Sequence, residues 1–496
     1  MFQNKIAYLV EYLTGKMRRH YPEPGAGSGD ERINKRFEGE LCSLFEDYIY
    51  RDGSGYFLMS KSGKLVVYNG LGYEESDTNT VLHSVIKSVM LNLGIGVVYA
   101  TNSVKKIAEE CLVQMSASHK YRFEPDRRYI VFNNCVLRLG MRQDEKDVRL
   151  EHSTAYRTDI VLDFDFEPEA TNSLWEKFYV TTIPNGDNRK TFQEYCGALL
   201  ADRNYYKIEY TCFVLGPGGN GKSVLVQAIS NVFGKGLISH FSPHQLFKSS
   251  QAMYHLAAVD GKLANICTDI TAESFANGDF KSFVSGEPLS ARHPYGRQTF
   301  EVTAPYMLCC ANEMPSSVDD TEGYHRRILP IESAQHTYTE EEKDTTLTIK
   351  LSAVECRQAI FNWCYEGFKR LRANGGKIEL GEAVKATQQA IKEDNNSARR
   401  WLRDRKYRKA DKAFIPQDSK NSNWVSFKSL YDDYKTYCID NNEGIPQKQR
   451  QIGRLFKSIG FHEWRRSDGM YYYIEKNNSM GVGAPSIDIN SVDLPF

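Results

Sequence analysis

The sequence predicts an α/β fold, in which a domain with a central parallel sheet is preceded by an α+β region and followed by a C-terminal winged helix. Three observations predict it. An apolar run, Tyr210 to Leu215, leads into a glycine-rich loop and then a helical pattern. Two further apolar runs each end in a polar side chain, as buried parallel strands do. Near the C-terminus, two helical patterns and a hairpin follow one another.

Length, composition, cysteine spacing and net charge limit the classes to which this protein can belong. The 496 residues suffice for about three domains, and 41% hydrophobic with 25% charged residues is ordinary for a soluble protein. Without an apolar run near the ~18 residues of a membrane span, or a signal-peptide core, we expect a cytoplasmic protein with no membrane partner. Eleven cysteines without a C-x-x-C pair argue against a disulfide framework or a zinc site. Zero net charge excludes a uniformly basic nucleic-acid binder but allows local basic patches.

Residues 1–120 are expected to form an α+β accessory domain for scaffolding or partner docking. Its expected elements are a helix over Ile6 to Arg19, a hairpin over 55–68, and helices near 79–93 and 102–115. No reactive constellation appears in this region.

Residues 121–208 are expected to form an α/β region before the main domain. The sequence predicts strands over 129–132 and 159–164, then helices over 175–181 and 191–200. Acidic side chains alternate from Asp163 to Glu169, which we interpret as a solvated strand edge because nothing places them on one metal.

The glycine-rich loop has the spacing G-x-x-x-x-G-K-[ST] of a phosphate-binding loop, or P-loop. Its residues, with the first residue of the following helix, are Gly216, Pro217, Gly218, Gly219, Asn220, Gly221, Lys222, Ser223 and Val224. Glycines let backbone N–H groups surround a phosphate at a helix N-terminus. Lys222 would reach the β and γ phosphates of ATP, and the Ser223 hydroxyl would bind Mg²⁺. Strand and helix on either side make a chance match improbable.

Two polar residues and an arginine pair follow the loop in order. A strand from Gly261 ends at Asp269, where a carboxylate of a P-loop protein holds Mg²⁺, although a capping role is an equal alternative. The run 306–311 ends at Asn312, whose amide can hold the attacking water. Arg326 and Arg327 precede a fourth apolar run, and either can serve as an arginine finger.

This ordered set resembles the superfamily 3 helicases, in particular the phage, plasmid and poxvirus type that is usually fused to primases. The resemblance implies an AAA+-like P-loop ATPase core over 209–345. It makes Lys222 the phosphate lysine, Ser223 and Asp269 the magnesium side, and Asn312 the sensor. It makes Arg327 the finger that acts in trans, with Arg326 as second choice. Asp269 lacks a neighbouring acid, so the residue that polarises the attacking water is either Glu273 or Asp269 itself, and no primase domain is evident.

A basic hairpin is the predicted DNA-contacting element. The resemblance places a hairpin in a central channel, and the segment Leu289 to Phe300 alternates around a Tyr-Gly-Arg turn, as a hairpin does. Four side chains offer donors to a sugar-phosphate backbone: Lys281, Arg292, His293 and Arg297. A solvated basic hairpin is the alternative.

Three segments complete the chain. Residues 346–420 are expected to form a helical lid and a basic linker, where eight cations and two aromatic residues from 399 to 412 either bind phosphates or form a solvated face. Residues 421–476 are predicted to form a winged helix. The exposed face of its second helix is expected to carry Lys448, Arg450, Gln451, Arg454 and Lys457.

The acidic tail 477–496 ends in Leu494, Pro495 and Phe496, and resembles the partner-docking tip of bacterial single-strand-binding proteins.

Together these features predict an ATP-dependent replicative DNA helicase of a phage, plasmid or other mobile element, working in a bacterial cytoplasm. ATP and Mg²⁺ are the expected cofactors, and single-stranded and forked DNA the expected partners. We expect a ring, with a hexamer as its expected size, because Arg327 has no phosphate of its own subunit to meet. The alternatives are an ATP-switched initiator that binds origin DNA without unwinding, and a small-molecule kinase.

Overall fold

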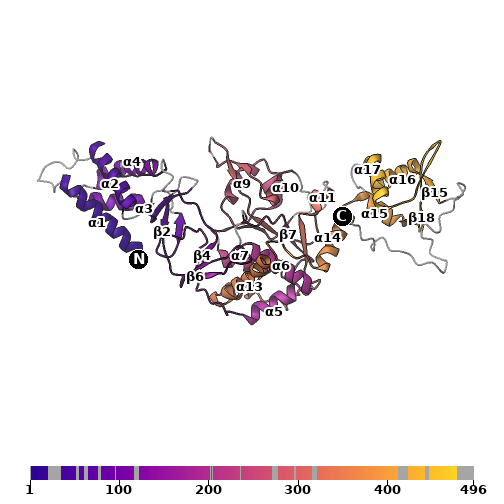
Figure 1. The fold of residues 1–496 in the computed structure, drawn as a ribbon, viewed down its shortest axis with the longest axis horizontal. Coiled ribbons are helices and arrows are strands. Elements are labelled where there is room, and N and C mark those ends of the chain that lie inside the picture. The colour runs from indigo at the N-terminus through magenta and orange to yellow at the C-terminus, as the bar shows by residue number, and fades with distance from the viewer. Residues whose placement is uncertain are drawn as a thin grey trace. The chain divides into compact units, whose positions relative to one another are not determined.

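The structure is a computed structural model that describes residues 2–20, 35–51, 55–60, 65–75, 80–94, 97–116, 122–200, 203, 205–234, 236–270, 278–294, 296, 298–315, 321–410, 423–441 and 446–476. The chain divides into two compact units. The first is Met1–Pro315 with Arg327–Val384, and the second is Ser316–Arg326 with Lys385–Phe496. Figure 1 colours the elements in chain order.

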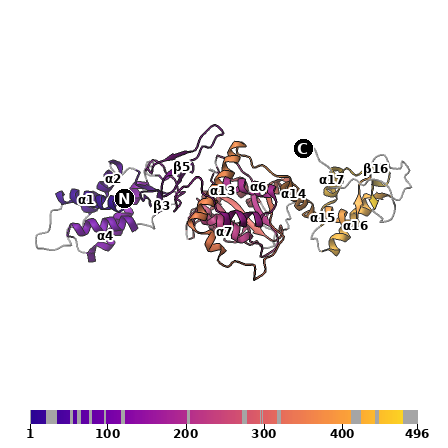
Figure 2. The same ribbon diagram turned by 90° about the horizontal axis from the view of Figure 1, so that it is seen from below.

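Helices and a small antiparallel sheet open the first unit (Figures 1 and 2). The helices are α1 (Phe2–His20), α2 (Lys35–Arg51), α3 (Thr80–Asn92) and α4 (Val97–Ser116). Strand β2 (Leu65–Tyr68) pairs with β1 (Phe57–Met59) and β3 (Tyr73–Glu75). Apolar faces of all four helices share one core with this sheet, because their 3.6-residue periodicity lines up one buried stripe. The expected hairpin and three helices are present, and α2 adds a helix that the sequence analysis did not predict.

A second antiparallel sheet precedes the main domain. It contains β4 (Tyr129–Val131), β5 (Val136–Arg138) and β6 (Val148–Leu150). The strand predicted over 159–164 is wrong, because only an isolated bridge joins Val131 and Val161. Ile160, Leu162 and Phe164 are nevertheless buried, and main-chain hydrogen bonds join this segment to Val131 and Asn133, so it lies alongside β4 without forming a regular strand. Helices α5 (Ser173–Thr182) and α6 (Gly186–Ala198) follow, near the predicted ranges.

The central sheet of the first unit is parallel. In the described part of the chain it contains five strands in the order β13-β7-β12-β9-β8. Their bounds are β7 (Thr211–Leu215), β8 (Ile238–Ser239), β9 (Ala264–Cys267), β12 (Tyr306–Ala311) and β13 (Ile328–Glu332). All of their residues except Glu332 are buried, as in a sheet covered on both faces. The α/β class with a parallel sheet is therefore confirmed.

Helices pack on both sides of this sheet. In Figure 1, α9 (Ala252–Val259) and α10 (Gly278–Ser285) lie above strand β7, and α5, α6, α7 (Lys222–Phe233) and α13 (Val354–Ala373) lie below it. The short helices are α8 (Pro243–Phe247) and α12 (Leu347–Leu351). Strands β10 (Leu289–Ala291) and β11 (Phe300–Val302) form a separate antiparallel pair.

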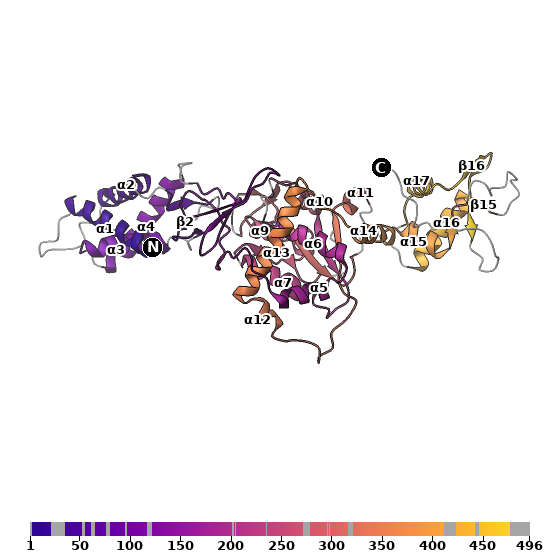
Figure 3. The same ribbon diagram turned by 60° about the horizontal axis from the view of Figure 1, so that its bottom comes forward.

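Two glycines let α6 and α13 approach closely (Figure 3). A Cβ at Gly197 would lie 2.2 Å from the Phe368 nitrogen, and a Cβ at Gly367 would lie 2.0 Å from the Gln193 oxygen. Any larger side chain would push the helices apart. Helix α13, from the region expected to be a lid, buries Phe368 and Leu371 in the same core as the central sheet.

The second unit has its own core of aromatic and aliphatic residues. Its helices are α11 (Glu322–His325), α15 (Ser397–Asp404), α16 (Phe427–Asp440) and α17 (Gln449–Ile459), with α14 (Glu382–Asp394) beginning at the boundary of the units. Strands β15 (Trp424–Ser426), β17 (Gly469–Tyr473) and β16 (Glu463–Arg466) form one antiparallel sheet, and β14 (Tyr407–Arg408) pairs with β18 (Glu475–Lys476). Among the described residues, no helix is both long and apolar enough to cross a membrane.

Candidate nucleotide-binding site

The predicted P-loop connects β7 to α7 and has the backbone that its glycines permit. Gly216, Gly219 and Gly221 have positive φ values of 148°, 73° and 94°, which other residues rarely adopt. A Cβ at Gly216 would lie 2.3 Å from the Ser333 hydroxyl oxygen, so this glycine also allows a close approach. Helix α7 begins at Lys222, so the loop ends at a helix N-terminus, where backbone N–H groups favour an anion.

Lys222 is buried and turned into its own loop. Its Nζ donates to the carbonyl oxygens of Gly216 and Pro217, both at 2.6 Å, and to Oδ1 of Asn220 at 3.1 Å. Burial lowers the pKa of the Lys222 ammonium, and the nearby Asp269 carboxylate acts in the opposite direction. All three hydrogen-bond acceptors are neutral, and a phosphate is a stronger partner for a buried ammonium.

The segment after β13 holds the loop from the other side, a feature that sequence reasoning missed. Asn220 donates from Nδ2 to the Ser333 hydroxyl and to the Ala334 carbonyl, both at 2.7 Å. The Thr337 hydroxyl donates to the Gly218 carbonyl at 3.1 Å, and the Tyr338 amide to the Gly219 carbonyl at 3.0 Å. We call residues 333–338 the strap. The sequence gives no signal for it, because the two segments lie more than 110 residues apart.

The strand order brings the other predicted groups to the loop. Strand β12 lies between β7 and β9, and all three are parallel, so their carboxyl ends share one edge of the sheet. Asn312 follows β12, and its Oδ1 lies 4.0 Å from the position of a Cβ at Gly218. Asp269, which follows β9 by two residues, is exposed and close enough to act on Lys222 electrostatically. The structure thus gathers Lys222, Ser223, Asp269 and Asn312 at one edge.

The residues at this edge fit Mg²⁺ bound together with a nucleotide. Ser223 and Asp269 are both exposed and offer a hydroxyl and a carboxylate, which are oxygen ligands that Mg²⁺ prefers. The described residues contain no group of three His, Cys, Asp or Glu side chains that would hold a metal by themselves. A P-loop site needs few protein ligands because phosphates and waters complete the coordination. Glu273, the alternative water-polarising residue, lies outside the described residues.

The two arginines of the predicted finger differ in exposure. Arg327 is only 8% exposed, and its Nη2 donates to the Ser285 hydroxyl at 2.7 Å within the same chain. Its carbonyl accepts from the Thr211 amide at 2.8 Å, so the main chain just before β13 is tied to β7. Arg326 is exposed at the end of α11. Arg327, the first choice from sequence, would have to leave Ser285 to reach a neighbouring subunit.

The four residues predicted to contact DNA differ in their exposure and in their contacts. Arg292 donates from Nη2 to the Tyr254 hydroxyl at 2.7 Å and lies 5.3 Å from the centre of that ring, so α9 holds it. His293 is exposed and stacks on Phe300 at 4.6 Å. Lys281 is half-buried on α10, and Arg297 lies outside the described residues. The expected hairpin is confirmed by the pairing of β10 with β11.

The basic stretch 399–412 has its aromatic residues in the core. Trp401 is fully buried and donates from Nε1 to Asp433 at 2.9 Å, and the Tyr407 hydroxyl donates to the same carboxylate at 3.1 Å. These rings are therefore closed to a nucleic-acid base. On α17, Ile452 and Phe456 are buried. The residues predicted to face outward are all exposed: Lys448, Arg450, Gln451, Arg454 and Lys457.

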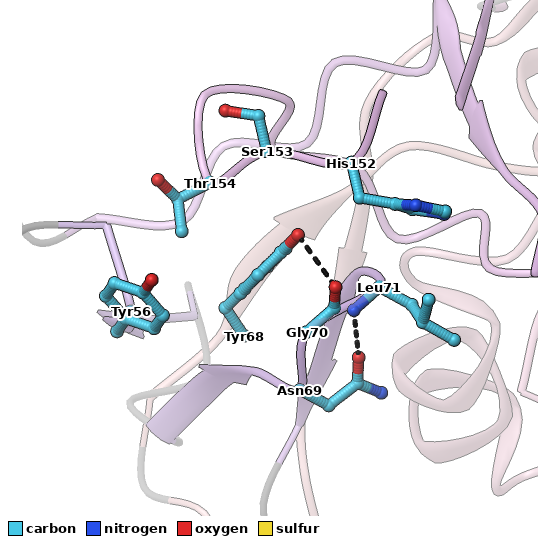
Figure 4. A pocket seen from close by; sticks show the side chains of 8 residues that line it. All are labelled: Tyr56, Tyr68, Asn69, Gly70, Leu71, His152, Ser153 and Thr154. Atoms are coloured by element: carbon cyan, nitrogen blue, oxygen red, sulfur yellow. Dashed lines mark hydrogen bonds between the residues drawn. The ribbon is translucent and has the colours of Figure 1, made fainter. Parts of the chain in front are cut away.

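A cavity of about 570 Å³ lies elsewhere in the first unit (Figure 4). Its walls come from the N-terminal sheet and the segment after β6, and the Tyr68 hydroxyl on one wall donates to the Gly70 carbonyl at 3.1 Å. The lining residues are Tyr56, Tyr68, Asn69, Gly70, Leu71, His152, Ser153 and Thr154. None of the candidate site residues predicted from the sequence lines this cavity.

Comparisons with known proteins give a partial match. Residues 214–327 match the model of a family of unknown function, DUF5906. No curated protein matches the chain. Similar solved structures include the NrS-1 C-terminal region, at 12% identity and a TM-score of 0.45, covering 85% of this chain and 96% of that one. Another, titled "SCCmec type IV Cch - active helicase", has 11% identity, a TM-score of 0.40 and coverage of 83% and 90%. At these scores, the function must be inferred from the chain's own residues.

Proposed function

We propose that this protein is an ATP-dependent DNA helicase of a phage, plasmid or other mobile element. One observation carries the proposal. A P-loop at the start of α7 lies at the same sheet edge as Asp269 and Asn312, which follow two neighbouring parallel strands. In P-loop enzymes, a lysine, a hydroxyl, a carboxylate and a water-positioning amide at such an edge serve phosphoryl transfer from a nucleotide.

Each residue has a role in the proposed hydrolysis. Lys222 exchanges its loop carbonyls for the β and γ phosphates, and the loop amides surround the β phosphate. Ser223 and Asp269 hold Mg²⁺, which when bound neutralises charge on the phosphate oxygens. Asn312 orients the attacking water, and Asp269 or Glu273 polarises it. The strap fixes the loop, so that its amides are oriented before the nucleotide arrives.

The proposed assembly is a ring, with a hexamer as the expected size. Arg326, which is exposed, would complete the site of a neighbouring subunit, and Arg327 is the alternative. Single-stranded DNA would pass the β10–β11 hairpin, where Lys281, Arg292, His293 and Arg297 would offer cations and donors to its backbone. In the second unit, α16, α17 and the β16–β17 hairpin are proposed to act as a winged helix on duplex or forked DNA.

Two assays on the purified chain test this proposal together. Strand displacement from a forked duplex and ATP hydrolysis are measured with Mg²⁺, and Lys222→Ala serves as the inactive control. The proposal expects displacement that requires ATP and stops in the Lys222→Ala variant. ATP-dependent assembly on DNA without displacement would support the initiator instead. Hydrolysis that ignores DNA and tolerates loss of Arg297 would support a small-molecule kinase.

A further inference from the structure

A single arginine holds both ends of the β10–β11 hairpin. Arg203 lies in the segment between α6 and β7, and its side chain is partly buried. Its Nη1 donates to the Ala304 carbonyl at 2.7 Å and to the Pro305 carbonyl, which lie between β11 and β12. Its Nη2 donates to the Phe283 carbonyl at 2.9 Å and to the Val284 carbonyl, which lie at the end of α10, ahead of β10. One guanidinium therefore joins the entry and the exit of the hairpin.

The entry to the hairpin is a helix end whose carbonyl groups need donors. The last four carbonyls of a helix have no partner inside that helix. At the end of α10, the Gly286 amide donates to the Phe283 carbonyl at 3.1 Å, and the Glu287 amide donates to the Ser282 carbonyl at 3.0 Å. Gly286 has a φ of 69°, the left-handed turn that commonly ends a helix. Arg203 supplies further donors here, and its positive charge suits the carboxyl end of the helix dipole.

The exit from the hairpin leads directly to the nucleotide-binding edge. Ala304 and Pro305 join β11 to β12, and both are buried. Tyr306 is the first residue of β12, and the centre of its ring lies 4.9 Å from Cζ of Arg203, a distance typical of a cation–π contact. Asn312 follows the last residue of this strand. The chain thus runs from the hairpin, through the residues that Arg203 holds, to the candidate water-positioning amide.

The guanidinium suits this place because of its shape. It carries five N–H donors in a planar fork, so that it can bind carbonyls of two segments at once, whereas a lysine ammonium is a compact point charge. The turn of the helix end is packed against it. A Cβ at Gly286 would lie 3.0 Å from Nε of Arg203, and the three nearest atoms all belong to that side chain. A change on either side of this contact should therefore disturb it.

We propose that Arg203 is a positioning residue that fixes the β10–β11 hairpin relative to the strand leading to Asn312, so that DNA on the hairpin alters ATP hydrolysis. This inference rests on the proposed function and deepens it. The hydrogen bonds of Arg203 all go to main-chain carbonyls, so it acts through the two segments that it holds. When the contact is lost, the hairpin should spend less time in the position that DNA stimulates.

The test measures ATP hydrolysis by the full chain over a range of oligothymidylate concentrations. Arg203→Lys should leave hydrolysis without DNA within about twofold. It should raise the DNA concentration for half-maximal stimulation about 5- to 30-fold, the factor for one or two net hydrogen bonds. Arg127→Lys is the matched control, because Arg127 donates to the Gly261 carbonyl at 2.6 Å, ahead of β9 and not of the hairpin. It should leave the stimulation by DNA unchanged.

A second pair of variants disturbs the same contact and keeps the arginine. Gly286→Ala would press on the guanidinium of Arg203, whereas Gly261 has a similar φ of 72° and no described atom within 4 Å of its added Cβ. Both changes strain the backbone, and only Gly286→Ala should raise the DNA concentration for half-maximal stimulation. Its effect should not add to that of Arg203→Lys, because both act on one contact. If circular dichroism shows that Arg203→Lys unfolds, the two glycine variants decide the question.

Hydrogen exchange follows the hairpin without nucleotide or DNA. The amides of β10 and β11 should exchange faster in Arg203→Lys, and those of α7 should not. Unchanged exchange in β10 and β11, or hydrolysis that falls equally with and without DNA, would overturn the proposal. Equal stimulation of the wild type and Arg203→Lys would also overturn it and leave the proposed function standing. Wild-type hydrolysis that ignores DNA would overturn the proposed function together with this inference.

Discussion

The P-loop and the β10–β11 hairpin were both predicted as functional from residue types, and the structure treats them differently. Around the P-loop, hydrogen bonds hold Lys222 to its own loop and Asn220 to the strap, and the parallel order of β7, β12 and β9 places Asp269 and Asn312 at the same sheet edge. On the hairpin, Arg292 is held by Tyr254, while His293 reaches solvent. The comparison shows that a motif located at strand ends predicts where its side chains lie, whereas a run of basic residues predicts only the local charge.

The largest expected effect separates these two regions directly. Lys222→Ala should abolish ATP turnover, because no other cation in the loop can meet the phosphates, and a single lost donor already lowers kcat by about 100-fold or more. His293→Ala, on the hairpin, should leave DNA-independent hydrolysis within about twofold and reduce only its stimulation by DNA. Steady-state hydrolysis with and without oligothymidylate measures both. Loss of basal hydrolysis in the histidine variant would contradict the separation.

The arginine pair gives the next largest effect. Arg326→Ala should lower kcat by roughly 10³-fold if this exposed residue completes a neighbouring site. Mixing it with Lys222→Ala protein should restore part of the activity, because each variant supplies the group that the other lacks. No recovery at any mixing ratio would count against shared sites. Arg327→Ala should instead lower stability through the lost contact with Ser285, by about 1–3 kcal/mol.

Much of the site could be predicted because its residues are tied to backbone geometry. A buried apolar strand, a glycine spacing and a helix place Lys222 and Ser223 without any distant contact. Asp269 and Asn312 follow from the rule that parallel strands end at one edge. The strap and the burial of Arg327 could not be predicted, because both depend on contacts between segments far apart in the chain.

Sequence patterns also led to wrong predictions where two different local structures produce the same pattern. Residues 159–164 alternate as a strand does, yet they bury side chains beside β4 with a single bridge. In the basic stretch 399–412, composition does not show that the rings of Trp401 and Tyr407 are buried and donate hydrogen bonds to Asp433. In the same unit, the partly exposed rings of Trp464 and Tyr471 lie on β16 and β17, which the sequence analysis predicted only as part of a hairpin. Composition does not tell which face of an element is covered.

Two glycine-to-alanine substitutions compare how tightly the helices of the two units are packed. Gly197→Ala should lower the free energy of unfolding by about 1–3 kcal/mol, because its Cβ would lie 2.2 Å from the Phe368 nitrogen. Gly453→Ala is the matched change in α17, where the nearest atom is Phe427 Cζ at 3.8 Å. It should raise stability by up to about 1 kcal/mol, because alanine favours a helix. Denaturant unfolding measures both, and equal effects would show that α6 and α13 can separate freely.

A smaller effect concerns the strap. Ser333→Ala removes the hydroxyl that accepts from Asn220 and donates to the Leu215 carbonyl at 2.7 Å. The loop should lose orientation, and KM for ATP should rise about 2- to 10-fold, as expected for one net hydrogen bond. Ser352→Ala is the control, because that hydroxyl accepts from Asn231 near the other end of α7. A rise in KM in both variants would indicate a general loosening of α7.

The smallest effect is a dependence on pH near α12. Hydrogen bonds from Lys350, then Thr346, hold the pKa of Asp344 at about 2, below its ordinary value of 3.8. A lowered folded pKa means that the stabilisation is complete above about pH 4 and is lost as the pH falls toward 2. Asp344→Asn should therefore lower Tm slightly at pH 6 and not at all near pH 2. A difference that persists at low pH would exclude the charge as its cause.

The most direct test of the central claim is the rate of ATP hydrolysis by the purified chain before and after single-stranded DNA is added. If the P-loop edge drives movement on DNA, the strand should raise the rate several-fold, and Lys222→Ala should show no hydrolysis in either condition. A rate that is the same with and without DNA, in protein that retains its fold, would contradict the account.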